Sequence, residues 1–166
     1  MASILMVAGE GLPFIKTGGL ADVIGSLPKA LTERGHEVKV VMPLYKKISD
    51  KYYNELHFDC EYSVSINYHE VPVRVFSKVV DDVCFFFIQH QGYFERDSLY
   101  GYQDDGERFG YFQKAVIEML NQLNYWPNII HCHDWHTGMI PCMVKETHDA
   151  DPRYRAIRFV YTIHNM

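Results

Sequence analysis

The strongest constraint on the fold is a strand, helix and strand pattern near the start of the chain. The apolar run from Ile4 to Ala8 predicts a buried strand, and the amphipathic segment from Leu20 to Arg34 predicts a helix that Gly35 ends with a left-handed cap. A second strand is expected from Glu37 to Met42. Two strands joined by a helix in this way make a right-handed βαβ unit of a parallel sheet. The chain is therefore expected to adopt a Rossmann-like α/β fold.

The middle of the chain has a different periodicity. From Phe58 onward, apolar residues recur at every second position in two segments, and the continuous apolar run from Val83 to Ile88 follows them. The polar break Asn67-Tyr68-His69-Glu70 is expected to be a hairpin turn. The apolar run is expected to return to the buried interior of the sheet. We therefore predict an antiparallel hairpin excursion at one edge of a parallel sheet that has helices on both faces.

Further elements are expected in the rest of the chain. The segment from Glu107 to Leu123 predicts a helix, because its apolar residues form one stripe. Asn128 to Cys132 and Ile157 to Ile163 are expected to be strands, and a helix leads from the first of them to about Thr147. The polar, tyrosine-rich segment from Pro43 to Asn54 is expected to be a loop with about one helical turn.

Composition restricts the class of protein. A length of 166 residues suits one domain, residues 1–166, and 48% hydrophobic residues supply an ordinary core. The net charge of -5 gives no general attraction to nucleic acid or to an acidic membrane surface. No apolar run reaches the roughly 18 residues of a membrane span, and Met1-Ala2-Ser3 lacks the charged region of a signal peptide, so a cytoplasmic protein is expected. The cysteines form no CxxC pair, which disfavours a disulfide framework.

The stretch from Phe14 to Val23 is the first candidate for a binding site. Gly18 and Gly19 lie at the corner between the first strand and the helix, so an anion can approach the N–H groups at the positive end of the helix dipole. Lys16 adds a positive charge there. The spacing matches neither a dinucleotide-binding loop nor a Walker A loop. The residues alone leave two interpretations open: an anion or diphosphate site, or a tight turn with a solvated lysine.

The stretch from His133 to Gly138 is the second candidate, because it follows a buried strand. In open parallel sheets, ligands bind outside the carboxyl ends of the strands. This stretch, the glycine corner and His164-Asn165 are therefore expected to share one edge of the sheet. Asp134 also fits the N-cap position of the following helix, and the two roles are compatible.

Two more groups of residues have open interpretations. His131, His133 and His136 suggest a metal site, but strand alternation directs Cys132 away from its neighbours, which disfavours zinc. The loop from Gly92 to Gly106 is rich in aromatic rings and carboxylates. Such a loop suits a sugar, whose C–H faces stack on aromatic rings, but the same rings can pack down onto the domain instead.

Four motifs, in order along the chain, resemble those of bacterial glycogen synthases and plant starch synthases. They are Lys16-Thr17-Gly18-Gly19-Leu20-Ala21-Asp22-Val23, Glu107-Arg108-Phe109, Ile129-Ile130-His131-Cys132-His133-Asp134-Trp135-His136-Thr137-Gly138 and Thr162-Ile163-His164-Asn165. The resemblance spans Ile4 to Asn165, although the region from about Ser49 to Phe94 matches only in general pattern. Gly9 is a departure, since the family commonly has a small residue with a side chain at that position.

The resemblance implies the N-terminal half of a GT-B glycosyltransferase, in which two Rossmann-like domains face each other across a cleft. Such an enzyme transfers glucose with retention from ADP-glucose, or alternatively UDP-glucose, to the non-reducing end of an α-1,4-glucan such as glycogen or starch, and it uses no metal or other cofactor. Because the chain stops at Met166 directly after a strand, we expect a truncated chain. The missing C-terminal domain would supply most of the nucleotide pocket, so the isolated piece is expected to be inactive.

The matching motifs also imply roles for individual residues. The catalytic group would consist of His164, Asp134 and Lys16. The donor would be bound by Lys16 beside the diphosphate, Gly18, Gly19, His164 and Asn165. Asp22 would hold sugar or order the pocket, and weaker candidates on the acceptor side are Glu10, Tyr100 and Trp135.

Two other classes of function are alternatives to this one. The chain could be a glucan-binding half-domain that uses its aromatic loop and catalyses nothing. A nucleotide-binding domain of the response-regulator type is disfavoured, because the acidic cluster that such domains carry after the first strand is missing.

Overall fold

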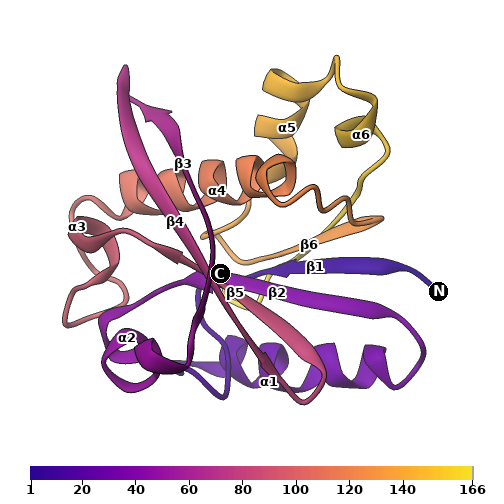
Figure 1. The fold of residues 1–166 in the computed structure, drawn as a ribbon, viewed down its shortest axis with the longest axis horizontal. Helices are drawn as coiled ribbons and strands as arrows, with labels where there is room; N and C mark the ends of the chain where they lie inside the picture. Colours follow the sequence, from indigo (N-terminus) through magenta and orange to yellow (C-terminus); the bar gives the residue numbers. More distant parts are fainter. Residues whose placement is uncertain (166) are drawn as a thin grey trace.

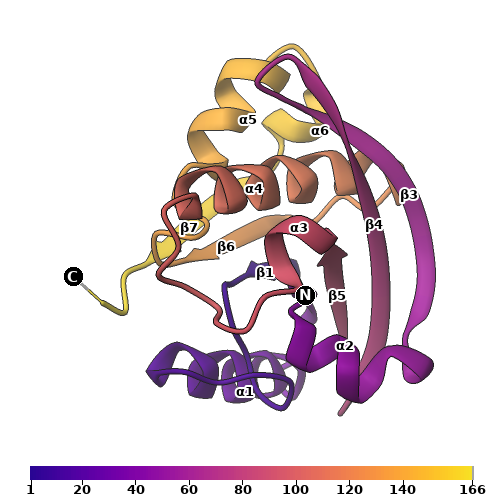
Figure 2. The same cartoon turned by 90° about the vertical axis from the view of Figure 1, so that its left-hand side faces the viewer.

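The computed structural model describes residues 1–165 as a seven-stranded sheet between two layers of helices (Figures 1 and 2). The strands lie in the order β3-β4-β5-β2-β1-β6-β7. They are β1 (Ser3–Val7), β2 (Glu37–Pro43), β3 (His57–Ile66), β4 (His69–Val80), β5 (Val83–Gln89), β6 (Ile129–His133) and β7 (Arg158–Thr162). The helices are α1 (Gly19–Thr32), α2 (Lys46–Tyr52), α3 (Gln91–Phe94), α4 (Asp105–Gln122), α5 (Ile140–His148) and α6 (Pro152–Arg155).

The strand pairing confirms the predicted sheet. β1 pairs in parallel with β2 and β6, β2 pairs in parallel with β5, and β6 pairs in parallel with β7. β3 and β4 form an antiparallel hairpin at one edge, and β4 joins it to β5. The hairpin turn is narrower than predicted, because His69 already pairs with Ile66. Asn67 and Tyr68 alone turn the chain, with φ of 49° and 65°, and such left-handed pairs match the twist of the flanking strands.

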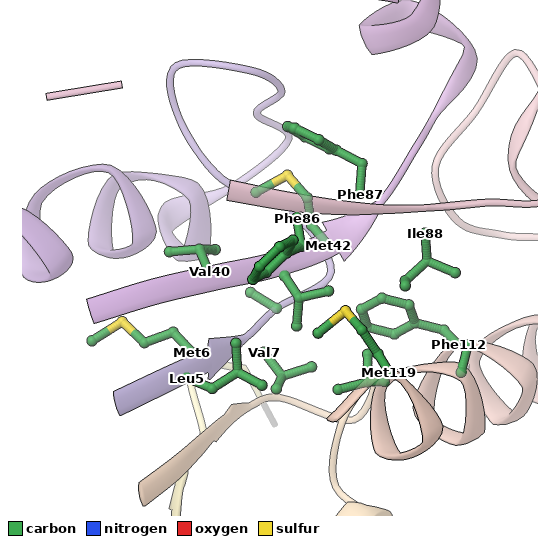
Figure 3. Close-up of a cluster of buried hydrophobic side chains, with 14 of the residues drawn as sticks. Leu5, Met6, Val7, Val40, Met42, Phe86, Phe87, Ile88, Phe112 and Met119 are labelled. Carbon is green, nitrogen blue, oxygen red and sulfur yellow. The ribbon is translucent and has the colours of Figure 1, made fainter. Parts of the chain in front are cut away.

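The core lies on both faces of the central strands. In Figure 2, α1 and α2 cover one face of the sheet, and α4, α5 and α6 cover the other. Figure 3 shows part of this core, with Val40, Met42 and Phe87 on the face away from α4. The labelled residues are Leu5, Met6, Val7, Val40, Met42, Phe86, Phe87, Ile88, Phe112 and Met119. Burying each of these large side chains contributes about 1.5–3 kcal/mol. Because helices cover both faces of the sheet, successive side chains of the central strands are all buried, which explains their continuous apolar sequences.

Two segments differ from the prediction. The segment after β2 forms α2 and a short 3₁₀ turn (Tyr53–Glu55), which is more helix than the single turn expected. Tyr45 and Ile48, three residues apart, are both buried, and this spacing on one face holds α2 against the domain. The helix after β6 begins only at Ile140, because hydrogen-bonded turns occupy the residues before it.

The parallel pairing of β1, β6 and β7 determines where a ligand can bind. These three strands are neighbours, so the loops at their carboxyl ends meet at one edge of the sheet. No helix among residues 1–165 has the length and apolar character needed to cross a membrane.

Candidate functional site

A pocket of about 220 Å³ opens at the shared carboxyl edge of β1, β6 and β7. Its lining, called the edge pocket below, consists of Glu10, Thr17, Gly18, Leu20, Tyr100, Asp134, Trp135, His136 and Asn165. The pocket brings together six of the residues singled out from the sequence: Glu10, Gly18, Tyr100, Asp134, Trp135 and Asn165. Lys16, Gly19, Asp22 and His164 do not line it. Larger hollows lie elsewhere on the surface, beside α5, the β3–β4 hairpin and α3, and none of these ten residues lines them.

Glu10 organises the glycine corner. Its buried carboxylate accepts hydrogen bonds from the backbone N–H of Thr17 at 2.7 Å, from the Thr17 hydroxyl at 2.5 Å and from the backbone N–H of Gly18 at 3.1 Å. Gly18 is the N-cap of α1, and as a glycine it has no side chain that could cap the helix. The Glu10 carboxylate therefore already accepts the N–H of Gly18, which the sequence predicted as a donor to a diphosphate. A bound anion would meet Gly19 and Lys16 at this corner.

Lys16 and Asp22 form an ion pair at the start of α1. The Lys16 ammonium lies 2.7 Å from both carboxylate oxygens of Asp22. Both side chains are about half exposed, at 48% and 54%, so the pair adds at most about 1 kcal/mol to stability. Asp22 thus holds the Lys16 side chain in place. Lys16 is thus both paired and half exposed, and neither interpretation of the glycine corner predicted the pair with Asp22.

Asp134 anchors the segment that follows β7. Its buried carboxylate accepts the backbone N–H of His164 at 2.5 Å and that of Asn165 at 3.3 Å, and the Asn165 amide donates to it at 3.4 Å. The backbone of Asp134 has φ 58°, a left-handed conformation that side chains other than Gly adopt rarely. The helix-cap interpretation of Asp134 is wrong, because α5 starts six positions later with Met139 at its N-cap. Asp134 instead ties the end of β6 to the end of β7.

Histidines gather beside this anchor. The Nδ1 atom of His133 lies 2.9 Å from the Nε2 atom of His164, and the ring of His131 stacks on that of His133 with centroids 4.0 Å apart. His131 in turn contacts the Thr162 hydroxyl at 2.8 Å. Burial lowers the pKa of His133 to about 3, so this ring is neutral at pH 7. The parallel pairing of β6 and β7 brings the three rings together.

His136 is enclosed by aromatic rings at the edge pocket. Its ring lies 4.0 Å from Trp135, 4.6 Å from Tyr100 and 4.9 Å from Phe109, measured between centroids. Burial lowers the pKa of His136 to about 4. A Cβ atom at Gly9 would stand 2.7 Å from this ring, so the glycine makes room for it. The sequence showed Gly9 only as a departure from the family pattern, and the structure shows that a side chain there would collide with His136.

The aromatic loop from Gly92 to Gly106 fits both interpretations in part. Phe94 is fully buried in the core, whereas Tyr100 lines the edge pocket with a partly buried ring. Arg108, at 0% exposure, donates to the carbonyls of Tyr93 and Leu99 at 2.7 Å and 3.2 Å. The loop is therefore packed down, and the same packing presents Tyr100 to the pocket.

The sequence candidates omit the polar residues Thr17 and His136 of the edge pocket, and also His133 beside it. Thr17 was part of a recognised motif, but its hydrogen bonds to Glu10 have no signature in the sequence. The sequence suggests His133 and His136 only as metal ligands, and within residues 1–165 no group of three or more His, Cys, Asp or Glu side chains is arranged to hold a metal ion. One signal could have indicated a structural role for His133: it is polar, it adjoins the polar Asp134, and both stand at the end of an apolar strand.

Comparisons with known proteins agree with these motifs. The family model of the starch synthase catalytic domain matches residues 3–166. Curated glycogen synthases of Desulforamulus reducens and Clostridium kluyveri are 43% and 45% identical over 163 residues, which is 98% of this chain and 34% of each relative. The catalytic domain of starch synthase IV from Arabidopsis thaliana, solved with ADP and acarbose bound, superposes with a TM-score of 0.86 at 32% identity, over 99% of this chain and 34% of that one. The chain spans about a third of the length of these relatives, and it belongs to the starch synthase catalytic domain family.

Proposed function

We propose that this chain forms part of a retaining glucosyltransferase that moves glucose from ADP-glucose to the non-reducing end of an α-1,4-glucan. The observation that carries the proposal is the edge pocket, where the glycine corner ordered by Glu10 faces the Asp134 anchor of His164 and Asn165. The related Arabidopsis structure, which contains ADP and acarbose, supports a nucleotide and a glucan as ligands. UDP-glucose is the alternative donor.

In this proposal Lys16 acts on the leaving diphosphate. Transfer breaks the bond between C1 of glucose and the diphosphate oxygen, so negative charge grows on that oxygen. The Lys16 ammonium and the positive end of α1 lie at the same corner, and both stabilise such charge. Gly19 has no side chain, and a Cβ atom there would meet no neighbour within 4 Å, so the backbone is open to an approaching phosphate.

His164 and Asn165 would contact the transferred glucose. Asp134 fixes the backbone of both residues, which places them for a sugar held at the edge of the sheet. A new bond forms between C1 and an acceptor hydroxyl, and the proton of that hydroxyl passes to the leaving phosphate. No metal or other cofactor takes part in this scheme.

The acceptor glucan would lie along the aromatic side of the pocket. Trp135 is 51% exposed, and its ring is close to that of Tyr100, with centroids 6.0 Å apart. Exposed aromatic faces suit the C–H faces of a sugar. Glu10 has a different task, because its carboxylate is already occupied by the glycine corner.

We further propose that residues 1–166 are one Rossmann-like domain of a GT-B enzyme, and that most of the nucleotide pocket lies on a second domain. The test is an assay of the natural full-length chain with radiolabelled ADP-glucose, UDP-glucose and a glycogen primer. Incorporation from ADP-glucose well above that from UDP-glucose supports the proposal. Retention of glycogen on the protein without incorporation from either donor would replace it with the glucan-binding alternative.

A further inference from the structure

We infer that His133 is a positioning residue that fixes the ring of His164 in the tautomer protonated at Nδ1. His164 then meets its ligand as a hydrogen-bond donor. The identity of that ligand as a sugar rests on the proposed function, whereas the state of the ring does not.

The fold holds His164 from two consecutive residues, His133 at the end of β6 and Asp134 directly after it. Asp134 binds the backbone N–H of His164, at 2.5 Å, and His133 binds its ring, with 2.9 Å between Nδ1 of His133 and Nε2 of His164. The two rings are nearly parallel, with an interplanar angle of 20°. Main chain and side chain of His164 are thus fixed by separate contacts.

Two proton arrangements are compatible with the contact between the rings. In the first, His133 donates its Nδ1–H to the lone pair of His164 Nε2. In the second, His164 donates its Nε2–H to His133 Nδ1, and the proton of His133 must then sit on Nε2. That Nε2 atom is buried and has no hydrogen-bond partner within residues 1–165. Because orphaned N–H donors are rare in protein interiors, the first arrangement is favoured.

The surroundings keep His133 in a single neutral form. It is fully buried, and His131 stacks on it with ring centroids 4.0 Å apart. Burial, with smaller contributions from His131 and His164, lowers the pKa of His133 to about 3. A neutral His133 has one proton only, and that proton is committed to His164. The donor in the contact between the rings therefore stays His133 at physiological pH.

The consequence for His164 is a fixed chemical role. With its Nε2 lone pair occupied, the neutral ring carries its proton on Nδ1. Such a ring cannot remove a proton from a ligand through Nε2, and it offers an N–H to an oxygen acceptor. A sugar hydroxyl oxygen is an acceptor of this class.

The tautomer can be measured directly in the natural full-length protein. Histidine labelled with ¹⁵N gives widely separated shifts for protonated and bare ring nitrogens in long-range ¹H–¹⁵N spectra at pH 7.5. We expect His164 to be protonated at Nδ1 and bare at Nε2, and His133 to be protonated at Nδ1. The exposed His69, on β4, is an internal reference for a solvated ring. Protonation of His164 at Nε2 in the wild type would overturn the inference.

Two substitutions test the positioning role. His133→Phe keeps a ring but removes the donor, so His164 should revert to a mixture of tautomers, and turnover should fall roughly tenfold, the value of about one hydrogen bond. His133→Asn keeps an N–H near the place of Nδ1 and should preserve the His164 shifts and most of the turnover. Equal loss in both variants with unchanged His164 shifts would contradict the inference. If the wild type transfers no glucose, the proposed function fails, but the wild-type spectra still decide the tautomer.

Discussion

At the scale of single residues, two buried carboxylates of this chain bind its own backbone. Glu10 accepts N–H groups of Thr17 and Gly18, and Asp134 accepts those of His164 and Asn165. Hydrogen bonds to a charged group are worth about 1.5–3 kcal/mol each, so both acids can hold a loop in one conformation. The groups that remain free to meet a ligand are the more exposed ones, such as Lys16 and Trp135.

Replacement of Lys16 tests the electrostatic part of the proposed function. Lys16→Gln in the full-length enzyme should lower kcat/KM by the equivalent of about 2–4 kcal/mol, by analogy with loss of one oxyanion-hole donor. Stability should change little, because the Lys16–Asp22 pair is half exposed. Lys29→Gln, on the same helix, is the matched control. A catalytic efficiency near that of the wild type would mean that Lys16 does not stabilise the leaving diphosphate.

Replacement of Glu10 tests its structural role. Glu10→Gln removes a negative charge from the N-terminal end of α1, and the amide cannot accept all three hydrogen bonds that the carboxylate receives. We expect a loss of about 1–3 kcal/mol in the free energy of unfolding, measured with urea. Glu70→Gln, at an exposed position of the β3–β4 hairpin, should leave stability unchanged. Equal stability of the two variants would mean that Glu10 does not order the glycine corner.

At the scale of elements, Arg108 connects α4 to the aromatic loop. Its guanidinium donates to the carbonyls of Tyr93 and Leu99 and to the carboxylate of Asp105, at 2.5 Å in the last case. Arg108→Lys keeps the charge but not the planar fork, so we expect a loss of roughly 2–4 kcal/mol in stability. Hydrogen exchange of residues 93–104 should become faster. Arg155→Lys, at an exposed position of α6, should cost under about 1 kcal/mol.

Sequence patterns predicted most elements because their signals are local. Alternation, helical stripes and the cap at Gly35 depend on neighbours along the chain, and the structure confirms the strands and helices that they predicted. The location of the edge pocket could be predicted, because parallel strands fix where their carboxyl ends meet. The contacts inside it could not. Asp134 meets His164 across 30 positions, and a left-handed φ at Asp134 has no sequence signal.

At the scale of the whole molecule, the site is open to water. Trp135 and Lys16 are each about half exposed, so residues 1–166 cannot surround a transition state by themselves. The isolated chain is therefore expected to incorporate no glucose above a blank in the radiolabel assay, whereas the full-length chain is expected to incorporate it. Turnover by the isolated chain would show that one domain is sufficient.

The two buried histidines of the site make the fold sensitive to acid. Burial lowers the pKa of His133 to about 3 and that of His136 to about 4, from an ordinary value of 6.5. Below pH 6.5 the unfolded chain therefore binds protons that the folded chain does not, and the free energy of unfolding falls as the pH falls. Between pH 7 and pH 5 each histidine should remove about 2 kcal/mol of stability.

Urea unfolding at half-unit steps of pH measures this loss, and His136→Phe gives the matched comparison. Phenylalanine fills the space between Trp135, Tyr100 and Phe109 without a titrating group, and neither ring nitrogen of His136 has a hydrogen-bond partner within residues 1–165 to lose. The variant should therefore match or exceed the wild type in stability at pH 5, with a shallower dependence on pH. His57→Gln, at an exposed position of β3, should keep the wild-type slope. A slope unchanged in His136→Phe would mean that the pKa of His136 is the same in the folded and the unfolded chain, and the enclosed neutral ring would be wrong.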